Sequence, residues 1–73
     1  MSNETEYDLY VLSEIAYTNK HKLENEDELF PDGWYSSKNY KLKIQIIGEA
    51  LEKDIDVKET DAFREAYMKG LFH

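Results

Sequence analysis

The chain of 73 residues contains no cysteine, a single proline and three glycines. Without cysteine it forms neither disulfides nor thiolate zinc sites, although a domain of this size has little core and often needs such a constraint. The glycines stand apart from one another, so the sequence has no glycine-rich loop to hold a phosphate. The absence of cysteine fits a reducing compartment, and we expect a cytoplasmic protein.

Long apolar runs are absent as well. The first eight residues, MSNETEYD, are polar and acidic, which argues against a secretory signal peptide. No apolar run approaches the roughly 20 residues that cross a bilayer. We therefore expect a soluble protein that does not bind membranes.

Basic residues are few, with nine Lys and Arg against sixteen Asp and Glu, which gives a net charge of −7. The whole excess lies in residues 1–32, because residues 33–73 carry seven acids and seven bases. Direct binding to nucleic acid is disfavoured, since phosphate contacts need a basic surface. A basic protein partner is more compatible, although acidic charge also simply maintains solubility.

Residues that carry chemistry do not occur in recognisable patterns. The two histidines, His21 and His73, have no partner at metal-ligand spacing. The acidic segment 24–28 lacks the glycine and glutamate positions of an EF-hand calcium loop. No serine stands in a GxSxG context. We predict that the protein is not an enzyme, with no catalytic residue, no cofactor and no metal site.

Hydrophobic periodicity predicts one compact all-α domain over residues 1–73. The expected helices span about 4–19, 37–54 and 57–71, with a long aromatic and acidic loop at 20–36. Aromatic side chains compensate for the small core, because each buries about 150–250 Å².

The first expected helix has two different apolar faces. One broad arc is aliphatic, and the tyrosines lie roughly opposite to it. A helix of this kind can contact two partners, and the tyrosine face contacts either the aromatic loop of the same chain or another protein. The aliphatic arc contains Leu9, Val11, Leu12, Ile15 and Ala16, and the tyrosines are Tyr7, Tyr10 and Tyr17.

The loop at 20–36 contains a strong turn signal at Pro31-Asp32-Gly33. Three aromatic residues flank this turn, and we expect them to close the open end of the helical core. A loop this long in so small a domain is often functional. The candidate interaction surface is therefore aromatic and consists of Tyr7, Tyr10, Tyr17, Phe30, Trp34 and Tyr35.

The second expected helix carries two apolar stripes, which predicts a central position between two neighbours. Its spine follows a helical rhythm through Tyr40, Ile44, Ile47 and Leu51. A competing interpretation exists, because residues 40–46 also alternate strictly between apolar and polar, as a half-buried strand does. That alternative gives an α+β fold.

The third expected helix starts with Asp56-x-x-Glu59, which resembles a capping box, and Thr60 is an alternative N-cap. A row of small residues, Ala62, Ala66 and Gly70, would let another helix approach closely, and Gly70 also suits a helix end. Met68 and Phe72 project elsewhere. If either of them faces solvent together with the tyrosines of the first helix, a homodimer becomes plausible.

The run GWYSSKNYKLKIQIIGEAL, residues 33–51, resembles the signature of a family of short proteins encoded on bacterial conjugative transposons, the transposon-encoded family TTRAP. The following segment, residues 55–60, fits the spacing of such proteins. This resemblance implies a cytoplasmic protein of a Gram-positive bacterium, carried on a mobile element, with no established activity.

Two functions follow as expectations. The first is an accessory or regulatory protein of a mobile genetic element that acts by binding an unidentified protein partner. The second is an acidic DNA mimic that inhibits a DNA-binding protein, since carboxylates can imitate phosphates. Salt separates them, because a contact made by charge weakens with added salt while an apolar contact persists.

Overall fold

The computed structural model describes residues 2–24, 28–30 and 39–70, without the side chains of residues 2–7. It contains three α-helices, α1 (Ser2–His21), α2 (Tyr40–Lys53) and α3 (Asp61–Met68), and a short 3-10 helix, η2 (Val57–Glu59). The all-α fold is confirmed, and the described residues include no strand. The alternative strand at 40–46 is wrong, because these residues form the first two turns of α2.

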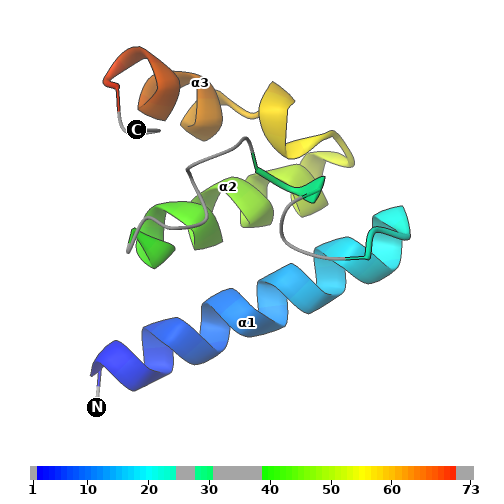
Figure 1. The fold of residues 1–73 in the computed structure, drawn as a ribbon, viewed down its shortest axis with the longest axis vertical. Helices are drawn as coiled ribbons and strands as arrows, with labels where there is room; N and C mark the ends of the chain where they lie inside the picture. The colour runs from blue at the N-terminus through cyan, green and yellow to red at the C-terminus, as the bar shows by residue number, and fades with distance from the viewer. Residues whose placement is uncertain (1, 25–27, 31–38, 71–73) are drawn as a thin grey trace.

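The helix α2 lies in the middle of the molecule, with α1 packed along one side and α3 on the other (Figure 1). Its two apolar stripes are therefore confirmed as the contacts of a central helix. The most buried positions are Ile46, Ile47 and Ala50, each with no exposed surface. The expected spine is shifted, since Ile47 is buried while Tyr40, Ile44 and Leu51 lie at the edge of the core.

The core also draws side chains from all the other described segments. Aromatic and aliphatic residues of α1, residues 29–30, η2 and α3 meet around α2. The buried apolar residues are Tyr10, Tyr17, Leu29, Phe30, Ile46, Ile47, Ala50, Val57, Phe63 and Ala66.

The helix α1 turns Tyr10 and Tyr17 to the core, whereas most of its aliphatic arc faces solvent and only Val11 packs partly against the core. Tyr17 is 1% exposed and Tyr10 is 7% exposed, whereas Leu12 is 62% exposed. A tyrosine can bury a large apolar ring and satisfy its hydroxyl group at the edge of the core. Tyr10 and Tyr17 therefore face the core of their own molecule, where Tyr17 contacts η2 and Tyr10 contacts α2, and not a partner protein; the Tyr7 side chain lies outside the described residues.

The expected third helix at 57–71 is interrupted at Thr60, and both predicted caps are used. Asp56 accepts a hydrogen bond from the Lys58 backbone and forms a capping box with Glu59 at the start of η2. Thr60 has an extended backbone and caps α3 by accepting from the Phe63 N–H at 3.1 Å. Each cap starts its own helix, so the segment forms two short helices.

Gly70 follows the end of α3 with a positive φ of 72°. Glycine adopts this left-handed conformation without steric cost, which confirms the predicted helix stop. None of the described helices has both the length and the apolar character that crossing a bilayer requires.

Candidate interaction surfaces

The described residues of the predicted aromatic surface are buried in the core and do not form a surface. Tyr10, Tyr17 and Phe30 are all buried, with exposed fractions of 7% or less. They belong to the core because α2 and η2 cover them, and a partner does not reach them. The other three predicted residues, the Tyr7 side chain, Trp34 and Tyr35, lie outside the part of the chain that is described.

Tyr17 joins α1 to the η2 segment. Its hydroxyl oxygen accepts the backbone N–H of Val57 at 3.0 Å, in a buried environment. Its ring stacks on the imidazole of His21 with centroids 4.2 Å apart. Burial raises the pKa of the Tyr17 hydroxyl above its ordinary value of 10.0, and the nearby carboxylates of Asp56 and Glu59 add to this effect, while the Val57 hydrogen bond opposes it.

Tyr10 and Phe30 contact a lysine that the sequence gives no reason to place in the core. Lys43 of α2 is only 3% exposed, and its Nζ lies 5.4 Å from the Tyr10 ring centroid and 5.6 Å from that of Phe30. An ammonium group near the face of an aromatic ring is attracted by the ring quadrupole. These aromatic rings therefore help to hold a buried charge.

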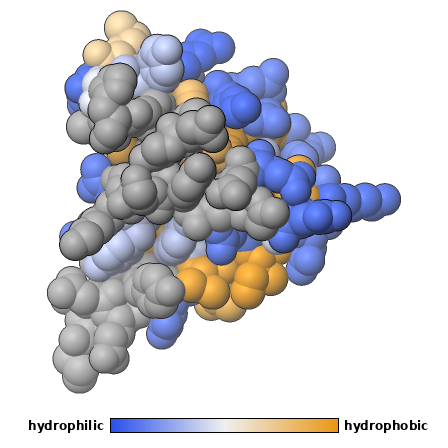
Figure 2. Space-filling model, in the orientation of Figure 1, coloured by the Kyte–Doolittle hydropathy of each residue, from blue (hydrophilic) through white to orange (hydrophobic). Residues whose placement is uncertain are grey.

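The first exposed apolar surface is the outer side of α1, which we call the α1 face. It consists of Leu9 (50% exposed), Leu12 (62%) and Ile15 (48%). These residues are three positions apart, so they lie on one side of the helix. The space-filling view shows hydrophobic surface at the lower edge of the molecule, where α1 runs (Figure 2).

The second exposed apolar surface is a shallow cleft on α3 and η2, which we call the α3 cleft. It has a volume of about 340 Å³. Phe63 forms its floor because it is nearly buried, whereas Tyr67 and Met68 are 66% and 85% exposed. Two cations complete the lining, so that the cleft is bounded by Lys58, Phe63, Arg64, Tyr67 and Met68.

The charges beside the two surfaces are opposite in sign. Asp8, one turn before Leu12, is exposed beside the α1 face. Lys58 and Arg64 are exposed at the α3 cleft. In the described part of the chain these three side chains form no ion pair, whereas Lys20, Lys53 and Lys69 each pair with a carboxylate of the same molecule.

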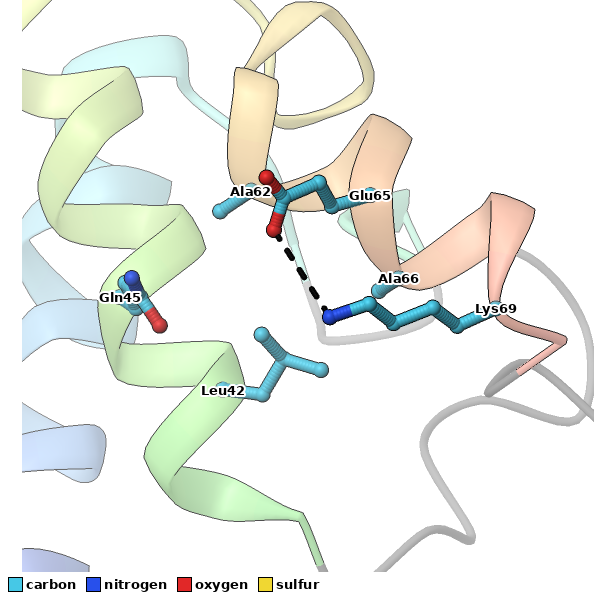
Figure 3. A pocket seen from close by; sticks show the side chains of 6 residues that line it. All are labelled: Leu42, Gln45, Ala62, Glu65, Ala66 and Lys69. Carbon is cyan, nitrogen blue, oxygen red and sulfur yellow. Dashed lines mark ion pairs between the residues drawn. The ribbon is translucent and has the colours of Figure 1, made fainter.

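A smaller hollow of about 60 Å³ lies between α2 and α3. Leu42 of α2 points toward the small side chains of Ala62 and Ala66, and the rim carries the Glu65–Lys69 ion pair at 4.0 Å (Figure 3). Ala62 and Ala66 of the predicted row of small residues thus let α3 approach α2 within the same molecule, while Gly70 lies beyond the end of α3. This hollow is a packing feature and is too small for a ligand of ordinary size.

Glu49 of α2 holds the start of α3. Its two carboxylate oxygens accept the backbone N–H groups of Asp61 at 2.8 Å and Ala62 at 3.2 Å, and Lys53 donates to it at 3.1 Å. The Asp61 hydrogen bond is the main reason that the pKa of Glu49 lies below its ordinary value of 4.5. This contact fixes the orientation of α3, and with it the α3 cleft.

Neither exposed surface was predicted as an interaction site from the sequence. The aliphatic arc of α1 was recognised, but the candidate surface was placed on the tyrosine face and on the aromatic residues of the long loop. A signal for the α3 cleft was present, because Met68 falls away from the predicted contact row of the third helix.

The described residues contain no cluster of histidine and carboxylate side chains that could hold a metal ion. Comparison of the chain with protein-family models, with curated proteins and with solved structures gave no match.

Proposed function

We propose that this chain is a small accessory or regulatory protein that acts by binding another protein chain through the α1 face. The observation that carries the proposal is the exposure of Leu9, Leu12 and Ile15 side by side on one helix. Contiguous apolar side chains rimmed by polar ones mark interaction sites, since water contact with such a patch is unfavourable.

The α1 face is not part of the buried core. Tyr10, Tyr17 and the partly buried Val11 supply the described contact of α1 with the core, and Leu9, Leu12 and Ile15 keep about half or more of their surface exposed. A helix that presents a narrow apolar stripe is a common means of protein recognition, in which the partner supplies a groove. The surface therefore suits a contact made by apolar burial more than one made by charge alone.

The proposal includes a cellular setting, which is a mobile genetic element in the cytoplasm. The resemblance of residues 33–51 to transposon-encoded proteins supports a cytoplasmic role in a mobile genetic element. Partners from DNA transfer or replication machinery would fit that setting. The same resemblance carries no catalytic motif, so it supports an accessory role rather than an enzymatic one.

A pull-down with one surface variant tests the proposal. Leu12→Glu places a charge in the middle of the α1 face, and Gln45→Glu makes the same change of net charge at an exposed position of α2. Both proteins and the wild type are incubated with nuclease-treated lysate of the source organism, washed at low and moderate salt, and compared by quantitative mass spectrometry.

The proposal expects a bound protein that survives moderate salt with the wild type and Gln45→Glu, and that is lost with Leu12→Glu. An acidic DNA mimic behaves differently, because its partner would wash off at moderate salt and would bind Leu12→Glu at least as well. Equal recovery from all three proteins would rule out the α1 face as the binding surface, and recovery from none would overturn the binding of a foreign protein through it.

A further inference from the structure

The α1 face and the α3 cleft lie at opposite edges of the molecule. The helix α2 separates α1 from α3 (Figure 1), and the space-filling view shows hydrophobic surface at the lower edge near α1 and again at the upper edge near α3 (Figure 2). One molecule therefore cannot bring its own two surfaces together, whereas two molecules can.

The two surfaces also complement each other. One is a ridge of aliphatic side chains on a helix, with the unpaired carboxylate of Asp8 beside it. The other is an open apolar cleft with the unpaired cations of Lys58 and Arg64 on its lining. A ridge fits a cleft, and opposite charges at the rim steer the approach and fix the orientation.

We propose that the α3 cleft of one copy binds the α1 face of a second copy, so that the chain associates with itself head to tail. The inference rests on the proposed function, because it names the partner of the same α1 face. It also assigns the α3 cleft, which the proposed function leaves unused.

Electrostatics favours this pairing over a symmetric contact between two α1 faces. The α1 segment carries four acids, Glu4, Glu6, Asp8 and Glu14, and a single lysine, Lys20. Packing two such helices together would place like charges in one interface, which is unfavourable. The contact with the α3 cleft instead neutralises exposed charge of both signs.

The position of the surfaces determines the kind of assembly. A contact between two different patches at opposite edges is heterologous, and it continues from one copy to the next unless the rotation closes a ring. Each contact buries little area, because three side chains of α1 meet one shallow cleft. Interfaces well below the standard size are weak, so the association depends strongly on concentration.

Sedimentation velocity measures the self-association of the chain directly. The wild type is examined between roughly 10 µM and 1 mM, a range that covers weak protein contacts, at low and moderate salt. We expect the weight-average mass to rise with concentration, and to rise less at moderate salt because the rim charges are screened. Circular dichroism verifies that every variant keeps the helical content of the wild type.

Two variants each disable one surface. Leu12→Glu disrupts the α1 face, and Arg64→Glu reverses a charge at the α3 cleft. Each should weaken self-association by about tenfold or more. The matched controls are Gln45→Glu for the first and Lys22→Glu for the second, which make the same charge changes at exposed positions outside both surfaces, and they should associate like the wild type.

Mixing the two disabled variants is the decisive measurement. Leu12→Glu keeps an intact α3 cleft and Arg64→Glu keeps an intact α1 face, so a one-to-one complex should form from two proteins that are monomeric alone. A symmetric α1 contact would leave Arg64→Glu self-associating and would give no gain on mixing. A symmetric α3 contact would leave Leu12→Glu self-associating.

A monomeric wild type at the highest concentration overturns the inference, as does a mixture that stays monomeric. The proposed function is judged separately by the pull-down. If Leu12→Glu loses a bound protein there while the wild type is monomeric, the α1 face binds a foreign partner and only the head-to-tail contact is wrong.

Discussion

The backbone N–H of Val57 donates a hydrogen bond of 3.0 Å to the hydroxyl oxygen of Tyr17, which lies 40 residues earlier in the chain. This buried contact connects α1 with the first residue of η2. It explains why α1 turns its tyrosine face inward, because the buried N–H needs an acceptor and an aliphatic side chain offers none. The aliphatic face of α1 is left exposed as a result.

Replacement of Tyr17 by phenylalanine tests this contact. The change keeps the ring and removes the acceptor, so the Val57 N–H is buried without a partner. The free energy of unfolding should fall by about 1–3 kcal/mol, the usual penalty for an unsatisfied buried group. Urea unfolding measures the difference, and Tyr67→Phe, at an exposed tyrosine, should change stability by less than about 0.5 kcal/mol.

Alkaline pH tests the same residue by another route. The pKa of Tyr17 is raised in the folded protein, mainly by burial, so the folded state keeps its proton where the unfolded state begins to lose it. The resulting stability is fully present below pH 10.0 and is lost as the pH rises above that value. The wild type should therefore lose more stability above pH 10 than Tyr17→Phe does, and parallel curves would contradict the assignment.

Glu49 links α2 to α3, and acid should weaken that link. The pKa of its carboxyl is lowered, chiefly by the Asp61 backbone hydrogen bond, so the folded state favours the ionised form. The contribution to stability is present above the ordinary pKa of 4.5 and is lost as the pH falls through the folded value.

Glu49→Gln should therefore be less stable than the wild type at neutral pH, and the difference should shrink as the solution is acidified. Urea unfolding between neutral pH and pH 3 measures it. Glu52→Gln, at an exposed position of the same helix, is the matched control because it makes the same change of charge. A difference that stays constant with pH would show that the carboxylate charge is not involved.

Thr60 is the residue that separates η2 from α3. It is fully buried, donates to the Val57 carbonyl at 2.8 Å and accepts from the Phe63 N–H. Thr60→Ala removes both bonds and should cost about 1–3 kcal/mol, as expected for a lost cap with buried partners. Thr60→Ser keeps the hydroxyl and should retain more of the stability in thermal unfolding. If the two variants are equally destabilised, the methyl group and not the cap is responsible.

The local features of the fold could be predicted from the sequence. The capping box of Asp56 and Glu59 and the cap at Thr60 involve residues within three positions of each other, so their spacing alone predicts them. The two apolar stripes of α2 likewise indicate a central helix before any neighbour is known. The sequence did not show that both caps are used, which divides the expected third helix into η2 and α3.

The orientation of α1 was decided only by the tertiary structure. Both of its faces are apolar, so periodicity predicts the helix but does not choose the buried side. The choice depends on groups that are distant in sequence: the Val57 N–H meets the Tyr17 hydroxyl, and Lys43 packs against the Tyr10 ring. This orientation of α1 also decides the candidate interaction surface. The described aromatic residues predicted from the sequence are buried, and the aliphatic side chains on the other side of α1 are exposed instead.

By itself, the sequence determined a small acidic helical domain without cysteine, with its caps and its central amphipathic helix, because these depend on composition and on spacing within a few residues. The tertiary structure decided which side chains reach solvent. Exposure depends on how helices pack against one another, and contacts such as Glu49 with Asp61 join positions that no local pattern relates. The α1 face and the α3 cleft therefore became visible only when the three helices were placed together.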